Sequence, residues 1–256
     1  MPEKDEITLS ACIICLNEAR NIARCLRSLT WADQIIVVDS GSEDDTVRIA
    51  REYTDAVFKR VWTGYVDQKN FALSKARGTW VLSVDADEVV SRALKEEIRR
   101  KITDPGAREG YRMPRRSFYQ GRWIHHSGFY PDRQLRLFKR TCGRWTGGRV
   151  HERMEIRGEV GELQNDLLHY PYGGVISGQL GAVDQFSGLL AADMHDRGER
   201  FHAILLFTRP FFKFLEVYVL KRGILDGLPG LIIAVTSAYA MFVRYTKLRE
   251  IERRLK

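Results

Sequence analysis

Short, almost wholly apolar segments alternate with helical patterns through the first hundred residues, and this alternation restricts the folds open to the chain. Strands are expected at residues 7–16, 34–38, 56–58 and 80–84, and helices at residues 19–29, 46–53, 68–76 and 91–101. Strands that are apolar at nearly every position are buried on both faces, which is typical of a parallel sheet covered by helices. The sequence therefore predicts an α/β fold with a mostly parallel, Rossmann-like sheet.

Polar side chains follow three of these strands at the point where each strand ends. Asn17 and Glu18 follow the first strand, Asp39 follows the second, and Asp85 and Asp87 follow the fourth. Ligands bind outside the carboxyl ends of the strands in sheets of this kind. We therefore expect these side chains to form one polar site.

The segment Asp85-Ala86-Asp87-Glu88 is the most acidic of these strand ends. Residues two apart in extended chain point to the same side and lie roughly 7 Å apart. Two such carboxylates suit a divalent cation, Mg²⁺ or Mn²⁺, that also binds phosphate oxygens. Taken alone, the segment is equally compatible with an acidic, solvated turn.

The composition changes after about residue 110. Residues 111–149 contain ten Lys or Arg residues, His125 and His126, and the single acid Asp132, with aromatic residues interspersed. This imbalance indicates an anionic partner. Nucleic acid is one possibility, but no nucleic-acid-binding motif is present. A phosphorylated or carboxylated small substrate fits the pattern equally well.

The last part of the chain is expected to be helical. Residues 201–220 and 223–243 are strongly apolar, and residues 200–256 carry eleven Lys or Arg against four acids. Apolar helices flanked by bases suit a helix lying on an anionic membrane surface. The longest uncharged stretch, 227–243, is shorter than the roughly 20 residues of a spanning helix. A buried helical cap and a dimer interface remain as alternatives.

The basic composition after residue 110 and the apolar, helical pattern of the last part of the chain predict two domains. Residues 1–172 form the sheet domain, with a nucleotide-binding part at 1–105 and an acceptor part at 106–172, and residues 173–256 form a helical region for membrane association or oligomerisation. The first six residues form no basic, apolar signal segment. The four cysteines are interpreted as reduced, mostly buried thiols of a cytoplasmic protein, with Cys12 and Cys15 on opposite faces of their strand.

Four motifs carry a resemblance to a known family. The segments CLNE at 15–18, VVDSGS at 37–42, QKNFA at 68–72 and DADE at 85–88 resemble the family 2 glycosyltransferases, which have the GT-A fold. Further segments, at 136–138, 150–152, 169–170 and 222–227, are similar to the subgroup that builds the lipopolysaccharide inner core. The known activity of that subgroup is addition of a β-1,4-linked glucose to a heptose.

The resemblance implies an inverting transfer from a nucleotide-sugar donor, UDP-glucose being the first candidate. It makes Asp87 a metal ligand and Asp85 a contact to the ribose, or to the metal through water. It places Asp39 at the uracil or ribose, with Asn17 and Glu18 in the same pocket. The alternative for Glu18 is a charge at a helix N-terminus.

Further residues follow from the chemistry of such a transfer. Lys69 is expected near the nucleotide or its phosphates, Glu88 is a candidate contact to the donor sugar, and His151 is a candidate metal ligand. An exposed helix lysine and a structural histidine are the alternatives. The acceptor hydroxyl needs a base, for which Glu152 is the first choice and Asp132 the second.

Arginines of the basic segment are candidates for binding phosphate or carboxylate groups of the acceptor. These are Arg115, Arg116, Arg133 and Arg136. The alternative is a basic surface that attracts the enzyme to anionic lipid. The expected location is the cytoplasm, with the protein peripheral on the inner face of the cytoplasmic membrane, and a homo-oligomer is possible.

Three other functions compete with inner-core synthesis. A glycosyltransferase for another cell-surface polysaccharide or lipid would share every motif above. A nucleotidyltransferase also places carboxylates at strand ends, but it would be expected to carry a Gly-rich basic loop where this chain has Asn17-Glu18-Ala19. A non-catalytic protein recruited to anionic membranes would leave the acidic residues unexplained.

Overall fold

The computed structural model describes residues 8–148 and 152–254. The chain divides into two compact units. Unit 1 contains Met1–Arg115, Arg133–Gly147 and Glu152–Tyr170, and unit 2 contains Arg116–Asp132, Gly148–His151 and Pro171–Lys256.

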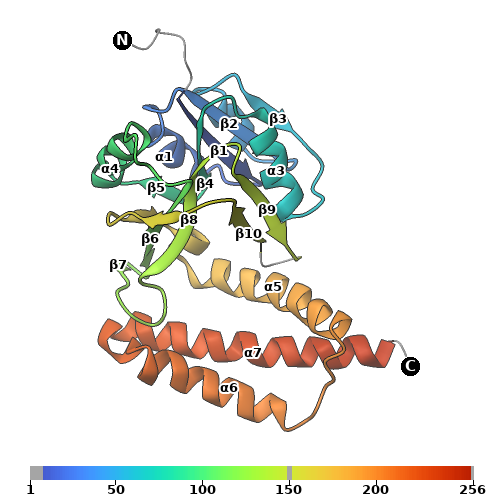
Figure 1. Cartoon of the computed structure of the whole chain (residues 1–256). Coiled ribbons are helices and arrows are strands. Elements are labelled where there is room, and N and C mark those ends of the chain that lie inside the picture. The colour runs from blue at the N-terminus through green and yellow to red at the C-terminus, as the bar shows by residue number, and fades with distance from the viewer. Residues whose placement is uncertain (1–7, 149–151, 255–256) are drawn as a thin grey trace. The chain divides into compact units, whose positions relative to one another are not determined.

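Unit 1 is built on a mixed sheet with helices on both faces (Figure 1). The strands of this sheet that lie in unit 1 are β1 (Leu9–Cys15), β2 (Gln34–Asp39), β3 (Val57–Lys59), β4 (Trp80–Asp85), β5 (Glu88–Val90), β8 (Asp132–Lys139, whose first residue belongs to unit 2), β11 (Val160–Glu162) and β12 (Leu167–His169). Strands β9 (Gly143–Gly147) and β10 (Glu152–Ile156) pair with each other in a separate two-stranded sheet. The helices of unit 1 are α1 (Ile22–Arg27), α2 (Thr46–Ala50), α3 (Tyr65–Lys75) and α4 (Arg92–Ile102). Strand β6 (Gly110–Tyr119) begins in unit 1 and ends in unit 2, where it pairs with β7 (Arg122–Trp123).

The order of the large sheet is β3-β2-β1-β4-β8-β6-β12-β5. Its first four strands are parallel, as the sequence predicted. The sheet becomes mixed beyond β4, because β8 pairs antiparallel with β4 and β12 pairs antiparallel with β5. The sequence did not predict these antiparallel pairs, since they join segments distant along the chain.

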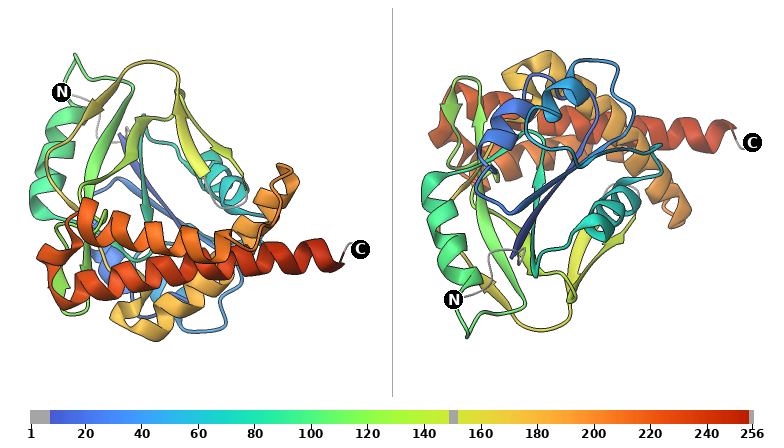
Figure 2. Two further views of the ribbon diagram at one scale, coloured as in Figure 1. Left: turned by 90° about the horizontal axis from the view of Figure 1, so that it is seen from below. Right: turned by 90° about the horizontal axis from the view of Figure 1, so that it is seen from above.

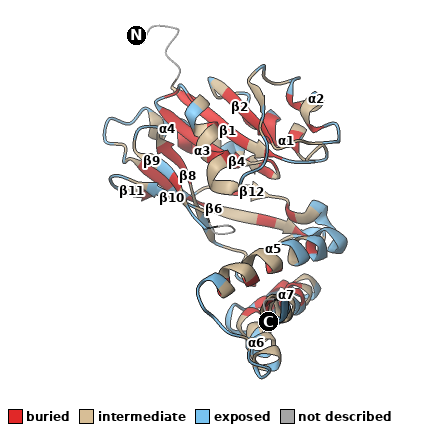
Figure 3. Cartoon of the chain, turned by 90° about the vertical axis from the view of Figure 1, so that its right-hand side faces the viewer, coloured by how far each residue is buried: buried red, intermediate tan, exposed pale blue. Residues whose placement is uncertain are grey.

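Alternation along the central strands divides the core of unit 1 into two clusters, one on each face of the sheet. Ala11 and Ile13 of β1 point into the cluster that includes α1 and α4, and Cys12 points into the cluster that includes α3. Cys15 belongs to the first cluster, so the two cysteines lie on opposite faces as predicted. Figure 2 shows α4 and α3 on opposite sides of the strands, and Figure 3 shows the central strands buried.

The strand register aligns the ends of β1, β2 and β4. Cys15 of β1 is paired with Asp39 of β2, and Ile14 of β1 is paired with Asp85 of β4. The predicted polar strand ends therefore share one edge of the parallel half of the sheet.

Ser91 caps α4, as expected, by accepting a hydrogen bond of 3.2 Å from the Leu94 amide.

Unit 2 is helical apart from β7 and the end of β6. Its helices are α5 (Ile176–Asp196), α6 (Leu205–Leu215) and α7 (Leu228–Arg254), with a 3-10 turn at Pro171–Gly174, a π-helical turn at Glu216–Leu220 and a 3-10 turn at Gly223–Asp226. Helix α7 lies between α5 and α6, with Ile233 and Ala234 in one buried cluster and Tyr245 and Leu248 in another (Figure 1).

Helix α7 is longer than the uncharged stretch in the sequence suggested. It continues through the charged residues to Arg254, because no glycine or proline follows Gly230 within it. Among the described residues it is the one helix that is long and apolar enough to cross a membrane by length and composition, although a third of its most apolar window is buried within the protein.

A buried carboxylate in unit 2 organises the loop after β7. The carboxylate of Asp226 accepts hydrogen bonds from the amides of His125 and His126, at 3.1 and 3.0 Å, and from the Ser127 hydroxyl at 2.8 Å. The His126 ring nitrogen Nδ1 lies 3.2 Å from the same side chain. Because these donors satisfy it, Asp226 can remain buried next to apolar helices.

We expect Gly78→Ala to lower the free energy of unfolding by about 1–3 kcal/mol, the usual cost of overpacking. A Cβ atom there would lie 2.7 Å from the backbone nitrogen of Ser10, which the neighbouring strand holds in place. Gly106→Ala is the control, because the nearest atom to its new Cβ would be 3.4 Å away on an Asp104 side chain. Urea unfolding followed by circular dichroism measures both, and equal stability of the two variants would contradict the packing argument.

Candidate active site

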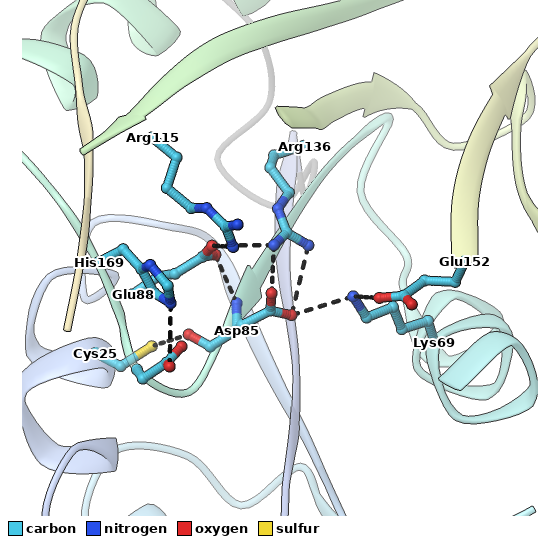
Figure 4. A network of polar contacts seen from close by, with 9 residues as sticks. Cys25, Lys69, Asp85, Glu88, Arg115, Arg136, Glu152 and His169 are labelled. Atoms are coloured by element: carbon cyan, nitrogen blue, oxygen red, sulfur yellow. Dashed lines mark hydrogen bonds and ion pairs between the residues drawn. The ribbon is translucent and has the colours of Figure 1, made fainter. Parts of the chain in front are cut away.

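The carboxylate of Asp85 lies at the end of β4 among three cationic side chains (Figure 4). The guanidinium of Arg136, from β8, contacts both of its oxygens, with Nη1 at 3.4 Å from Oδ1 and Nη2 donating to Oδ2. The Lys69 ammonium, from α3, lies 3.2 Å from Oδ1. Burial by itself disfavours the charged carboxylate, but Arg136, Lys69 and Arg115 together hold the pKa of Asp85 well below its usual range.

Glu88 contacts Asp85 and is completely buried. It accepts a hydrogen bond of 2.9 Å from the Asp85 amide, and its Oε1 accepts from Arg136 at 3.0 Å and from Arg115 at 3.1 Å. A buried carboxylate is tolerated when it is paired and hydrogen-bonded in this way. Glu88 therefore fixes the positions of the two arginines. Its full burial argues against the sugar contact expected from the sequence.

Lys69 joins Asp85 to a second carboxylate. Its ammonium lies 2.8 Å from Oε1 of Glu152, at the start of β10, and 4.6 Å from the centre of the Trp145 ring. The Lys69 side chain is only 4% exposed, whereas Glu152 retains 19%. The exposed-lysine alternative is therefore wrong, and the expected position of Lys69 near the nucleotide or its phosphates stays a prediction.

Asp87 is paired with a histidine that reasoning from the residues did not select. Nε2 of His169 lies 3.3 Å from Oδ2 of Asp87, and the amide of Tyr170 donates to the Asp87 carbonyl at 2.9 Å. The antiparallel pairing of β12 with β5 places His169 opposite Glu88. The available signal was the His-Tyr pair at 169–170, which belongs to the inner-core resemblance.

The donors at Asp87 fit a divalent cation. A carboxylate and a neutral imidazole are suitable ligands for Mn²⁺ and tolerable for Mg²⁺, and such ions fill their remaining positions with water and phosphate oxygens. Within residues 8–148 and 152–254 no group of three or more His, Cys, Asp or Glu side chains is arranged as a closed metal site. His151, the other predicted ligand, lies outside the described residues.

Asp39 is buried at the end of β2, with its oxygens turned toward its own loop. They accept from the Gly41 amide at 3.0 Å, and from the Ser42 amide at 3.0 Å and hydroxyl at 2.5 Å. The Ser42 hydroxyl in turn accepts from the Asn17 amide at 2.8 Å. The side-chain oxygen of Asn17 accepts from the Glu43 amide at 2.9 Å. These hydrogen bonds hold the loops after β1 and β2 together.

Glu18 lies close to the acidic segment. Burial raises the pKa of its carboxyl group, a hydrogen bond of 2.8 Å from Asn21 opposes this, and the negative charges of Asp87, Asp44 and Asp85 raise it further. Its amide donates to the Thr46 hydroxyl at 2.7 Å. Glu18 therefore belongs to the same polar region as Asp85 and Asp87.

The structure brings most of the predicted side chains of unit 1 into one network and leaves others elsewhere. The network contains Lys69, Asp85, Glu88, Arg115, Arg136 and Glu152 (Figure 4). Arg133 instead lies 3.2 Å from Glu162 on the surface of unit 1. Arg116 and Asp132 belong to unit 2, where Nη2 of Arg116 lies 2.7 Å from Nε2 of His125.

The structure gives two of the predicted acceptor-binding arginines partners within the protein. Arg115 is paired with Glu88, and Arg136 is paired with Asp85 and Glu88, while their contact with an acceptor stays a prediction. The sequence could not distinguish the two uses, because the pairing depends on β6 and β8 lying beside β4 and β5 in the folded sheet.

The fold and the strand-end site are those of a glycosyltransferase of the GT-A type. The model of the family Glycosyl transferase family 2 matches residues 10–155, and the chain belongs to that family. It is 34% identical over 253 residues to the lipopolysaccharide core biosynthesis glycosyltransferase LpsC of Rhizobium meliloti (strain 1021), covering 95% of this chain and 92% of that protein.

Two further comparisons give weaker similarities. An uncharacterized glycosyltransferase of Rickettsia conorii (strain ATCC VR-613 / Malish 7) is 30% identical over 260 residues, covering 94% of this chain and 90% of that protein. The solved structure of S. aureus TarS 1-349 has a TM-score of 0.48 and 15% identity, covering 97% of this chain and 92% of that one.

We expect Arg136→Met to lower the free energy of unfolding by about 3–5 kcal/mol at pH 7, because it leaves Asp85 and the buried Glu88 short of a partner. The lowered pKa of Asp85 contributes stability that is present above its unfolded value, about 3.9, and is lost as pH falls through the folded value. The difference in the free energy of unfolding between wild type and variant should therefore become smaller as the pH is lowered.

Arg133→Met is the matched control for this measurement. It makes the same change on the same strand, but Arg133 forms a surface pair with Glu162. Its effect on stability should be small and nearly independent of pH. Urea unfolding at pH values from 3 to 7 measures both variants, and a larger effect at Arg133 than at Arg136 would contradict the assigned role of the buried network.

Proposed function

We propose that this glycosyltransferase transfers a hexose, glucose from UDP-glucose, with inversion to a heptose of a lipid-linked lipopolysaccharide inner-core acceptor, and that it requires a divalent metal. The observation that carries the proposal is the pairing of Asp87 with His169 beside the Asp85–Lys69–Glu152 network, in a chain so similar to a lipopolysaccharide core glycosyltransferase. The donor, the acceptor and the metal are parts of the proposal.

The donor binds at the carboxyl ends of β1, β2 and β4 in this proposal. The loops that carry Asn17, Glu18 and Asp39 surround the nucleoside, and Asp85 receives the ribose. Asp87 and His169 hold Mg²⁺ or Mn²⁺. When bound, the ion neutralises negative charge on the departing nucleotide diphosphate.

The chain's own residues perform the proton transfer. Glu152 accepts the proton of the acceptor hydroxyl as this oxygen attacks the anomeric carbon from the face opposite the leaving nucleotide. Lys69, 2.8 Å from Glu152, fixes the orientation of the carboxylate. Asp132 is the second candidate for the base. Arg136 and Arg115 act indirectly, because they hold Asp85 and Glu88 in position.

The domain assignment follows the same scheme. Residues 1–105 bind the donor, residues 106–172 contribute to the acceptor site, and residues 173–256 associate with the membrane that contains the acceptor. The bases Arg116 and Arg133 attract the anionic acceptor. The proposed location is the cytoplasmic face of the inner membrane.

A panel of nucleotide sugars tests the donor. We expect the purified protein to release UDP from UDP-glucose at least tenfold faster than from UDP-galactose or UDP-N-acetylglucosamine, when a heptose-containing core acceptor and Mg²⁺ or Mn²⁺ are present. Chelation by EDTA should abolish the release. Preference for a different donor, or full activity in EDTA, would overturn the corresponding part of the proposal.

Substitutions in the site test the assigned roles. Asp87→Asn should lower transfer at least a hundredfold and weaken Mn²⁺ binding, because it removes the charged metal donor. Glu152→Gln should lower the transfer rate by roughly 10²–10⁴-fold, the usual contribution of a general base. Its Mn²⁺ binding should be unchanged. Glu155→Gln is the matched control, because Glu155 lies on the same strand and pairs with Arg153 at the surface.

Product formation and Mn²⁺ binding by electron paramagnetic resonance are measured for each variant. Normal transfer by folded Asp87→Asn protein would refute the metal role. Loss of transfer by Asp132→Asn but not by Glu152→Gln would move the base to the second candidate.

A further inference from the structure

The large apolar side chains that unit 2 exposes are concentrated in one part of the chain. Thirteen of the nineteen exposed large apolar side chains among the described residues fall within residues 204–242, which contain α6, the turn after it and the first half of α7. Scattered exposed apolar residues are normal on soluble proteins, but a concentration of this kind marks an interaction surface.

This apolar surface has three parts. They are Ile204, Phe207, Phe211 and Phe212 at α6; Val219, Leu220, Ile224 and Leu225 in the turn; and Leu228, Leu231, Val235, Tyr239 and Phe242 on α7. The α7 members recur at intervals of three or four residues and so form a single stripe. Phe207 is 74% exposed and Leu220 is 77% exposed, which are large values for such side chains.

Cationic groups accompany the apolar surface. Residues 204–242 carry the bases Arg209, Lys213, Lys221 and Arg222 against the two acids Glu216 and Asp226. Asp226 is buried, and Glu216 is shared by Lys213 and Lys221 at 2.9 and 2.6 Å. The charge presented to a partner is therefore positive.

A second copy of the chain is a poorer partner than an anionic lipid surface. A twofold interface brings the same patch of both copies together, so the positively charged patch of one copy, which includes the exposed Arg209 and Arg222, would face that of the other. An anionic bilayer instead receives the apolar side chains below its headgroups and the bases at its phosphates.

The packing of α7 is incompatible with a helix that crosses the bilayer alone. It is the middle helix of three, and Thr236 accepts a buried hydrogen bond of 2.9 Å from Gln179 of α5. Lys247 lies 2.7 Å from Asp184, also of α5. If α7 crossed the bilayer, its polar partners on α5, Gln179 and Asp184, would have to enter the hydrocarbon region with it. Helix α6, with 11 residues, extends roughly 16 Å, about half of the hydrocarbon thickness.

We propose that unit 2 is a monotopic membrane anchor, in which α6, the turn and the exposed stripe of α7 enter one leaflet of an anionic bilayer while α7 lies in the plane of the membrane. The functional meaning of this anchor rests on the proposed transfer to a lipid-linked acceptor, because it holds the enzyme in the leaflet where that acceptor resides. Binding to lipid can be measured without any transfer.

Co-sedimentation with preformed vesicles tests the partner. The protein should bind vesicles of phosphatidylcholine and phosphatidylglycerol at 7:3 at least tenfold better than phosphatidylcholine alone. The triple variant Phe207→Gln, Phe211→Gln, Phe212→Gln should lose at least tenfold of this binding while keeping its circular dichroism spectrum. Wild-type binding by the variant would overturn the proposal.

A matched control uses exposed apolar residues of α5 and the residue before it. Val175→Gln, Ile176→Gln and Leu180→Gln together should leave vesicle binding within twofold of wild type, because these residues lie outside the apolar surface. An equal loss in this control would overturn the assignment to α6 and α7. A dimer in solution that only the phenylalanine variant dissociates, with vesicle binding unchanged, would assign the surface to self-association.

Depth measurements distinguish an in-plane helix from a spanning one. A fluorescent NBD label is placed on the single-substitution variants Leu228→Cys, Val235→Cys and Phe242→Cys, in a Cys142→Ser background whose other three cysteines are buried. Positions 228 and 242 are about 21 Å apart along the helix. Quenching by spin-labelled lipids should give the same shallow depth at all three positions. A position 235 much deeper than both ends would show that α7 spans.

Transfer assays separate failure of the anchor from failure of the proposed function. The phenylalanine variant should glucosylate a soluble, lipid-free core oligosaccharide at the wild-type rate, but an acceptor embedded in vesicles at least tenfold more slowly. Inactive wild-type protein that still binds vesicles through these residues would refute the transfer and keep the anchor. Equal rates of the variant on both acceptors would refute the anchor and keep the transfer.

Discussion

Burial of the Glu88 carboxylate is the constraint on which the site depends. Completely removed from solvent, this charge is tolerated only because two guanidinium groups and the Asp85 amide satisfy it. The same arginine, Arg136, then contacts Asp85, and Lys69 connects Asp85 to Glu152. Asp85 and Glu152 are thus connected to the buried charge of Glu88 through Arg136 and Lys69.

The network also gives the acidic groups of one region different surroundings. Asp85 is surrounded by cations, which keep it charged, whereas Glu18 is buried near other acids, which raises its pKa. Asp87 lies outside the cationic network and contacts His169 instead. The carboxylates are therefore differentiated by their surroundings, and Asp87 is the one paired with a histidine.

The helical unit satisfies a different physical requirement. Polar groups are paired within it, as in the Gln179–Thr236 hydrogen bond and the Asp226 loop contacts, while thirteen large apolar side chains of residues 204–242 are exposed. A soluble core would bury the latter groups. The proposed anchor gives these side chains an apolar environment, and it holds the enzyme at the membrane that contains the proposed acceptor.

The sequence alone determined the parallel half of the sheet, the acidic ends of its strands and the family, because apolar strand patterns and contiguous motifs are local. Tertiary structure decided which groups meet. His169 reaches Asp87 only through the antiparallel pairing of β12 with β5, and Arg136 reaches Asp85 only because β8 lies beside β4. No local pattern encodes such pairings, since they depend on the burial of strands far apart in the chain.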